Sequence, residues 1–156
     1  MTRLRERSAS ETRPLPDEAV LSGPGHLGDR WPALLRTIGA IAVLVTGAVH
    51  LQQYLSYGFS EIPTIGTLFL LNFAGATVIG LGLLVPGARM RRWHVLGALG
   101  GIGLAATSIV FLLISEHQTL FGFHEHGYRP AIVLALAAEA VAVVSLGAYL
   151  ARRGRP

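Results

Sequence analysis

The stretch TIGAIAVLVTGAVHLQQYLSY at residues 37–57 carries no charged side chain over a length that can cross a membrane. A transmembrane helix needs about 20 mainly apolar residues to cross a hydrocarbon layer of about 30 Å. Three similar stretches follow, at about residues 62–85, 93–115 and 130–150. Each is apolar nearly all round, whereas a soluble helix is apolar along one stripe. The sequence therefore predicts an all-α integral membrane protein, with a four-helix bundle at residues 34–151.

The arginines lie asymmetrically around the four stretches. All 13 basic residues are arginine, and all except Arg129 flank the same side of these stretches. Short loops rich in arginine stay in the cytoplasm during membrane insertion. We therefore predict a multi-pass protein of the bacterial inner membrane with its N- and C-termini in the cytoplasm. The net charge of +4 then belongs to the cytoplasmic rim, where arginines contact anionic membrane lipids. The sequence has no basic patch interleaved with aromatic residues, so it gives no indication of nucleic-acid binding.

The two ends of the chain differ in composition from the four stretches. Residues 1–33 mix arginine and acidic residues with serine, threonine and proline, without hydrophobic periodicity, which predicts a flexible, disordered cytoplasmic tail. This tail lacks the compact apolar core and small-residue cleavage site of a signal peptide. Residues 152–156 are expected to form a short cytoplasmic C-terminal tail. Because the chain has no cysteine, disulfides and thiolate metal sites are excluded.

Small and polar residues recur at helical spacing and predict which helix faces meet inside the bundle. In the first stretch this face comprises Gly39, Ala42, Thr46, His50, Gln53 and Tyr57. In the third and fourth stretches it comprises Gly97, Gly101, Ala105 and Ser108, and Ala135, Ala138, Glu139, Ala142, Ser145 and Tyr149. We interpret the small residues as packing positions, because they let helix backbones approach closely.

Glu139 is an acidic residue near the middle of the fourth stretch. A charged side chain at the centre of a membrane helix costs about 2.5–3.5 kcal/mol on insertion scales, so it needs a proton or a partner. Asn72, at a similar depth in the second stretch, is the expected partner. Thr46, Thr107 and Ser108 lie near enough in depth to join them. Two interpretations stay open: Glu139 binds a substrate or relays a proton, or its neutral form hydrogen-bonds Asn72 and locks two helices together.

His50 lies on the inward face of the first stretch, with Gln53 on the same face one turn further out. Imidazole binds metals and haem, hydrogen-bonds quinone carbonyls and transfers protons. The alternative is a neutral histidine bonded to a neighbouring hydroxyl or backbone carbonyl. A bis-histidine haem would need a second histidine at a matching height, for which His117 is the candidate. The candidate ligand-binding or proton-relay residues are His50, Gln53, Asn72 and Glu139.

The stretch EHQTLFGFHEHGYRP at residues 116–130 is densest in polar side chains. Imidazole and carboxylate groups suit Zn²⁺, Cu²⁺ and Ni²⁺, and a His-x-His pair can bind from one extended segment. The candidate metal ligands are His117, His124, Glu125 and His126. The alternative is a solvated loop whose aromatic residues lie among the lipid headgroups, with Arg129 paired to Glu125 or Glu116.

Two segments carry a recognisable combination of residues. LLRTIGAIAVLVTGAVHL at residues 34–51 has a Leu-Arg start and a Gly-x-x-His-Leu ending, and LFLLNFAGATVIGLGLLVPGARMRRW at residues 68–93 has a polar residue ahead of a small-residue run. These segments resemble the first half of DoxX-like four-helix membrane proteins. The resemblance implies a four-helix fold and links to quinone-coupled redox and oxidative-stress complexes, and it draws attention to Arg36, Gly47, His50 and Asn72. The chain departs from that family in carrying Asn72 where an acidic residue is usual, and in its histidine-rich loop.

The polar interior predicts binding rather than catalysis. No nucleophile and base constellation, phosphate-binding loop or dinucleotide fingerprint is present in the sequence. We expect a non-enzymatic accessory protein that binds a partner, a lipophilic small molecule or a transition metal. The alternatives are a redox subunit that handles quinone or haem through His50, and a small proton-coupled transporter that uses Glu139. Other membrane subunits or a second copy of the chain are the expected protein partners.

Overall fold

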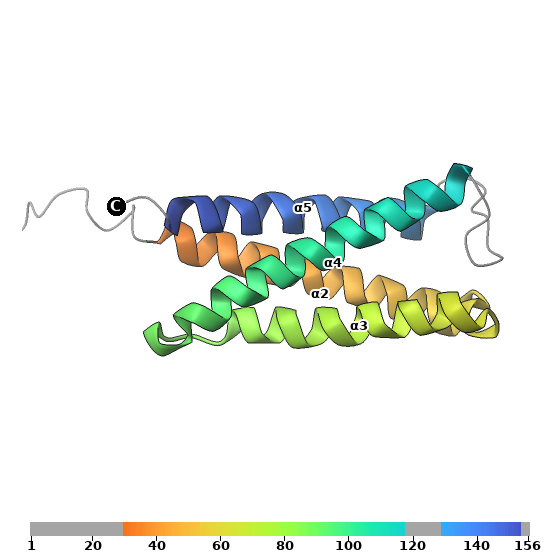
Figure 1. Cartoon of the computed structure of the whole chain (residues 1–156), viewed down its shortest axis with the longest axis horizontal. Coiled ribbons are helices and arrows are strands. Elements are labelled where there is room, and N and C mark those ends of the chain that lie inside the picture. The colour runs from red at the N-terminus through yellow and green to blue at the C-terminus, as the bar shows by residue number, and fades with distance from the viewer. Residues whose placement is uncertain (1–29, 118–128, 154–156) are drawn as a thin grey trace, which may run out of the picture.

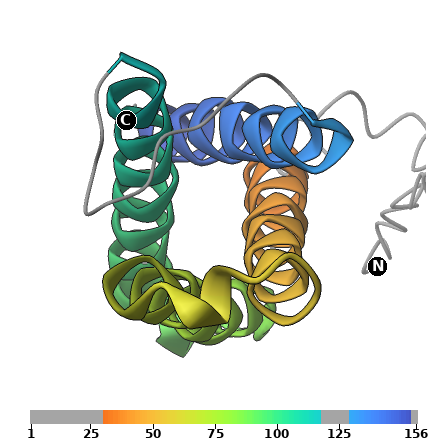
Figure 2. The same cartoon turned by 90° about the vertical axis from the view of Figure 1, so that its right-hand side faces the viewer.

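The computed structural model describes residues 30–117 and 129–153, and within these ranges the chain is helical. The long helices are α2 (Trp31–Ser56), α3 (Pro63–Leu84), α4 (Arg91–His117) and α5 (Pro130–Arg153), with short 3₁₀ turns η2 (Phe59–Glu61) and η3 (Ala88–Met90). Successive helices run in opposite directions (Figure 1), and seen from one end the inclined helices form the four sides of a square (Figure 2). The predicted all-α architecture with four long helices is confirmed over the described part of the chain.

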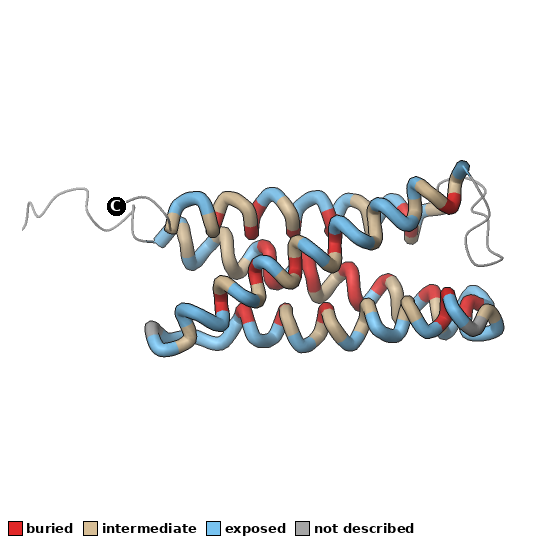
Figure 3. Tube along the Cα trace, in the orientation of Figure 1, coloured by how far each residue is buried: buried red, intermediate tan, exposed pale blue. Residues whose placement is uncertain are grey.

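The four helices have the length and the surface of membrane spans. They contain 26, 22, 27 and 24 residues, and each is long and apolar enough to cross a membrane. Large apolar side chains are exposed along them, including Leu71 at 62%, Val78 at 74% and Val144 at 70% (Figure 3). Soluble monomers rarely expose so continuous an apolar surface. The structure thus indicates a multi-pass membrane protein.

The helix boundaries lie close to those that the sequence predicts, with one exception. α2 begins at Trp31, several residues before the predicted start near Thr37, with Pro32 in its first turn. Proline is favoured there because the first amide groups of a helix have no intrahelical acceptor. Gly58 and Gly87 in the connections have φ of +76° and +121°, a backbone conformation that glycine adopts without steric cost.

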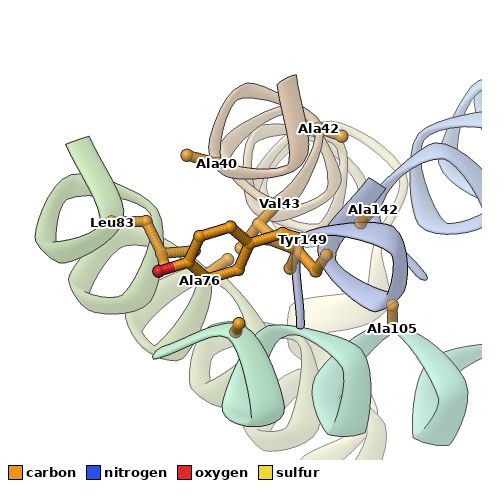
Figure 4. Close-up of a cluster of buried hydrophobic side chains, with 10 residues drawn as sticks. Ala40, Ala42, Val43, Ala76, Leu83, Ala105, Ala142 and Tyr149 are labelled. Atoms are coloured by element: carbon orange, nitrogen blue, oxygen red, sulfur yellow. The ribbon is translucent and has the colours of Figure 1, made fainter. Parts of the chain in front are cut away.

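The core consists largely of small residues in the half of the bundle that holds the start of α2 and the end of α5. Ala40, Ala76, Ala98, Ala142 and Leu146 are fully buried. Figure 4 shows the ring of Tyr149 among these side chains, close to Leu83 and Val43. Small residues let the helix backbones approach, so packing here is dense.

The residues of the predicted inward faces are buried or half-buried, with one exception at a helix end. On α5, Ala138, Glu139, Ala142, Ser145 and Tyr149 are all buried, as the helical spacing predicts. The prediction for Tyr57 is wrong, because its side chain is 53% exposed. Tyr57 caps α2 at its C-terminal end and has left the helical path. Its ring instead lies 5.7 Å from the guanidinium carbon of Arg129.

Arginine side chains join the helices at one end, which we call the arginine-rich end and define by Arg36, Arg91 and Arg153. Arg36 of α2 donates to the backbone carbonyls of Leu83 and Val85, at the C-terminal end of α3. Such bonds satisfy carbonyl oxygens that have no partner within the helix. Arg153 donates to the carbonyl of Arg91 at 2.9 Å and so joins α5 to α4. We call the opposite end, with η2 and the start of α5, the distal end.

Candidate ligand-binding cavity

A cavity of about 400 Å³ lies in the distal half of the bundle, with side chains from all four helices in its wall. His50 and Gln53 line it from α2, Asn72 from α3 and Glu139 from α5. The sequence singled out these residues separately, on three different stretches. The structure brings all four to the wall of one cavity.

The glycines of α4 differ in how closely the neighbouring helices approach them. A Cβ added to Gly97 would lie 3.1 Å from the side chain of Leu83, and one added to Gly101 would lie 2.9 Å from Leu146. A Cβ added to Gly103 would have no heavy atom within 4 Å. α4 crosses the bundle obliquely (Figure 1).

His50 is held in a defined orientation within the cavity wall. Its Nδ1 lies 2.9 Å from the carbonyl oxygen of Thr46, and its Nε2 lies 3.2 Å from Ser108 Oγ. A carbonyl oxygen only accepts, so Nδ1 carries a hydrogen and Nε2 of the neutral ring accepts from Ser108. The ring also packs edge-on against Phe69, with 5.0 Å between centroids. These contacts match the interpretation of His50 as a neutral histidine bonded to a hydroxyl and a backbone carbonyl.

Glu139 of α5 is a buried residue in the wall of the same cavity. Its side chain is 2% exposed, and it follows Pro130 by nine residues, or about 14 Å along the helix axis. Among the described residues, neither Glu139 Oε1 nor Asn72 Oδ1 has a hydrogen-bond partner. These two oxygens therefore take no part in the expected pairing of Glu139 with Asn72.

Several buried polar atoms in the cavity wall have no hydrogen-bond partner. Both the amide nitrogen and the amide oxygen of Gln53 are unpartnered within the described structure, and this side chain is only 6% exposed. Asn72 Oδ1 and Glu139 Oε1 share this property. Leaving a buried polar group unsatisfied costs about 1–3 kcal/mol. These atoms can form hydrogen bonds with a polar group that enters the cavity.

The cavity reaches the apolar surface of the bundle between α3 and α4. Its exposed lining residues are Leu71 on α3 and Gly103, Thr107 and Phe111 on α4. The lining residues on α2 and α5 are all buried or half-buried. We call the gap between α3 and α4, defined by these four exposed residues, the side opening. It faces the surface that a membrane would cover with lipid.

A cation stands at the distal end of the cavity. Arg129, the residue before α5, lines the cavity and lies over the rings of Tyr57 and Phe59, with 5.7 and 5.6 Å to the ring centroids. Cation–π contacts of this kind hold a guanidinium in place. Sequence reasoning placed Arg129 in the loop and did not connect it with the interior.

Of the four candidate metal ligands, only His117 lies within the part of the chain that the structure describes. His117 is exposed at the end of α4, and its Nδ1 lies 2.8 Å from the Leu113 carbonyl oxygen. His124, Glu125 and His126 lie outside the described residues. Within residues 30–117 and 129–153 no three metal-ligating side chains come together. His117 also does not line the cavity, so the described structure does not bring it beside His50 as a second haem ligand.

Ser108 lines the cavity but is not among the candidate site residues that the sequence predicts. It appeared as the continuation of a small-residue stripe and as one of several hydroxyls at the depth of Glu139, and its contact with His50 was not foreseen. The signal that could have found it is its position on the inward face of α4, seven residues after Gly101.

No protein-family model, curated protein or solved structure matches this chain. The assignment of function therefore rests on the cavity itself.

Proposed function

We propose that the protein is a non-enzymatic membrane protein that binds a lipophilic small molecule in the distal cavity. The observation that carries this proposal is the buried, unpartnered amide of Gln53, which faces a cavity of about 400 Å³ together with Asn72 and Glu139. Small-molecule sites are mainly apolar pockets of roughly 300–1,000 Å³ with a few placed polar groups. The side opening supports entry from the lipid phase rather than from water.

The chemistry of the wall selects the class of ligand. Gln53 offers one donor group and one acceptor, and Asn72 Oδ1 offers a further acceptor. The remaining lining is mostly aliphatic and aromatic, including Leu68, Phe69 and Leu136. We infer a molecule with a compact head group that bears carbonyl or hydroxyl oxygens and with an apolar tail that leaves through the side opening. Quinones belong to this class of molecule. A redox subunit that handles quinone, the alternative function, would therefore use the same cavity.

The membrane setting belongs to the same proposal. The arginine-rich end faces the cytoplasm of a bacterial inner membrane, with anionic lipids around it, and the cavity lies in the outer half of the bilayer. Support comes from the bonds of Arg36 and Arg153, which gather the arginine-flanked helix ends on one side. The resemblance to DoxX-like proteins and the partnership with other membrane subunits or a second copy stay predictions.

The experiment compares two neighbouring glutamines. Protein in lipid nanodiscs is titrated with a short-chain benzoquinone, and lipophilic molecules that co-purify are extracted and identified by mass spectrometry. Gln53→Leu should weaken binding about tenfold or more, the effect of losing about 1.4 kcal/mol. Gln52→Leu should bind as the wild type does, because Gln52 is exposed and does not line the cavity.

Each outcome decides between the candidate functions. Equal binding and equal co-purified material in the wild type and in Gln53→Leu would contradict the proposal. A haem absorption band in the purified wild type would favour the cytochrome alternative. Flux of protons into proteoliposomes that Glu139→Gln abolishes would favour the transporter.

A further inference from the structure

A second hollow lies at the arginine-rich end, where α5 ends and α4 begins (Figure 1). It is an open groove of about 930 Å³, lined by Arg89 on η3, Arg91 and Arg92 on α4 and Arg153 on α5. We call it the arginine groove and define it by these four residues. The first three are exposed and Arg153 is half-buried. The groove shares no lining residue with the distal cavity, so it is a separate candidate site.

Arg153 is held in place within the groove. It donates to the backbone carbonyl of Arg91 at 2.9 Å and to the Tyr149 hydroxyl at 2.9 Å. Its guanidinium carbon also lies 5.4 Å from the centroid of the Tyr149 ring. Both hydrogen bonds come from Nη1, which leaves the N–H groups of Nη2 and Nε for an anion. A cation that is ordered in advance loses less freedom when a ligand binds.

No carboxylate of the described chain neutralises the arginine groove. The acidic side chains among the described residues are Glu61 on η2, Glu116 near the end of α4 and Glu139 in the distal cavity, all away from the arginine-rich end. The three exposed arginines form no hydrogen bond or ion pair with another described side chain. Positive charges close together repel one another, and an anion that enters the groove removes this repulsion. The charge of the groove therefore complements an anionic ligand.

Aliphatic side chains continue the groove toward the middle of the bundle. Val95 and Leu96 line it from α4, four and five residues after Arg91, which is about 6–8 Å further along the helix axis. Leu150 lines it from α5, three residues before Arg153. A phospholipid in a membrane has the same order, with phosphate at the surface and acyl chains below it. A soluble anion would leave these aliphatic side chains without a partner.

We infer that the arginine groove binds an anionic phospholipid whose head group carries two phosphates, as that of cardiolipin does. Guanidinium groups pair with phosphate through two parallel hydrogen bonds, and four arginines can hold two phosphates. Basic pockets between transmembrane helices bind cardiolipin head groups in membrane proteins. The groove is a site distinct from the distal cavity. Its ligand follows from the crossing of the membrane and does not depend on the small molecule proposed for the cavity.

The test measures how tightly cardiolipin binds to the full chain in detergent, by native mass spectrometry of the protein with bound lipid. Arg91→Gln/Arg92→Gln should weaken binding about tenfold or more, the effect of losing two contacts to an anionic head group. Both side chains are exposed, and Arg153 donates to the backbone of Arg91, so the contact between α4 and α5 is kept. Without lipid, this variant should unfold at the wild-type temperature.

Arg30→Gln/Arg152→Gln is the matched control, with the same change in charge at the same end of the bundle. Arg30 precedes α2 and Arg152 is the penultimate residue of α5, and both are exposed. Neither lines the arginine groove, so this variant should bind cardiolipin as the wild type does. Equal weakening in the two double variants would indicate a diffuse attraction to the whole rim and would overturn the site.

Leu96→Glu tests the groove without removing an arginine. Leu96 is 58% exposed, so the change disturbs little packing, and the new carboxylate competes with phosphate for the guanidinium groups. This variant should also bind cardiolipin more weakly. Wild-type affinity in both Leu96→Glu and Arg91→Gln/Arg92→Gln would overturn the inference.

Three ligands distinguish the source and the number of the phosphates. Cardiolipin should bind more tightly than phosphatidylglycerol, which carries one phosphate, at equal phosphate concentration. Equal affinity would contradict the head group with two phosphates, and displacement of cardiolipin by millimolar inorganic phosphate would indicate a site for a soluble anion instead. Gln53→Leu should bind cardiolipin as the wild type does, because Gln53 lines the distal cavity and not the groove. The two sites can therefore fail independently.

Discussion

Gly47 of α2 lies directly against Ala76 of α3, so that a Cβ added to Gly47 would come within 2.7 Å of the Ala76 Cβ. The Cβ added to Gly47 would also lie 3.4 Å from the carbonyl oxygen of Phe73, a backbone atom that cannot move aside as a side chain can. Gly47→Val forces the helices apart, and we expect it to lower the free energy of unfolding by about 1–3 kcal/mol. Thermal unfolding followed by circular dichroism in detergent measures the loss.

Gly82→Val is the control for this prediction. Gly82 is exposed on α3, and a Cβ there would meet no heavy atom within 4 Å. Its stability should equal or exceed that of the wild type, because glycine is a poor helix former. If both variants lose equal stability, the contact between α2 and α3 is not the cause.

Gln53→Leu should make the protein more stable while it weakens ligand binding. Gln53 is buried with both amide atoms unpartnered, so the unliganded protein bears the cost of their desolvation. An apolar side chain of similar size removes that cost, and we expect the free energy of unfolding to rise by about 1 kcal/mol. Gln52→Leu, at an exposed position, should change it little. Reduced stability of Gln53→Leu in the absence of ligand would show that the amide has a structural role.

The fold was largely predictable because helix length and apolar composition are properties of contiguous sequence. The inward faces followed from helical spacing, which correctly placed Thr46, Gln53 and Glu139 in the interior. Spacing did not predict where α2 begins or that Tyr57 turns outward, because helix ends depend on capping and on neighbouring groups.

The site was predictable as a set of residues but not as a set of contacts. Depth along a helix suggested Asn72 as the neighbour of Glu139, because each lies a similar number of residues from the distal end of its helix. Depth does not define the rotation of α4, which brings the Ser108 hydroxyl to His50 Nε2. The cavity has lining residues from all four helices, so no single stretch of sequence could predict it.

The orientation of the bundle can be measured directly because the chain has no cysteine. Ser60→Cys places a thiol on η2 at the distal end, and Arg89→Cys places one on η3 near the arginine-rich end, both at exposed positions. In intact spheroplasts, a membrane-impermeant maleimide should label Ser60→Cys and should reach Arg89→Cys only after lysis. The reverse pattern would place the arginine-rich end outside and would contradict the predicted topology.

Filling the side opening should slow ligand entry without unfolding the bundle. Gly103 is an exposed residue of the opening, and a Cβ added there would meet nothing within 4 Å, so Gly103→Phe has room for its ring. We expect the association rate of the short-chain benzoquinone to fall about tenfold, because access through the opening sets that rate. Gly82→Phe adds the same ring to an exposed position of α3 away from the cavity and should bind at the wild-type rate. An unchanged rate in Gly103→Phe would mean that the ligand enters past Arg129 at the distal end, from the aqueous side instead of the lipid.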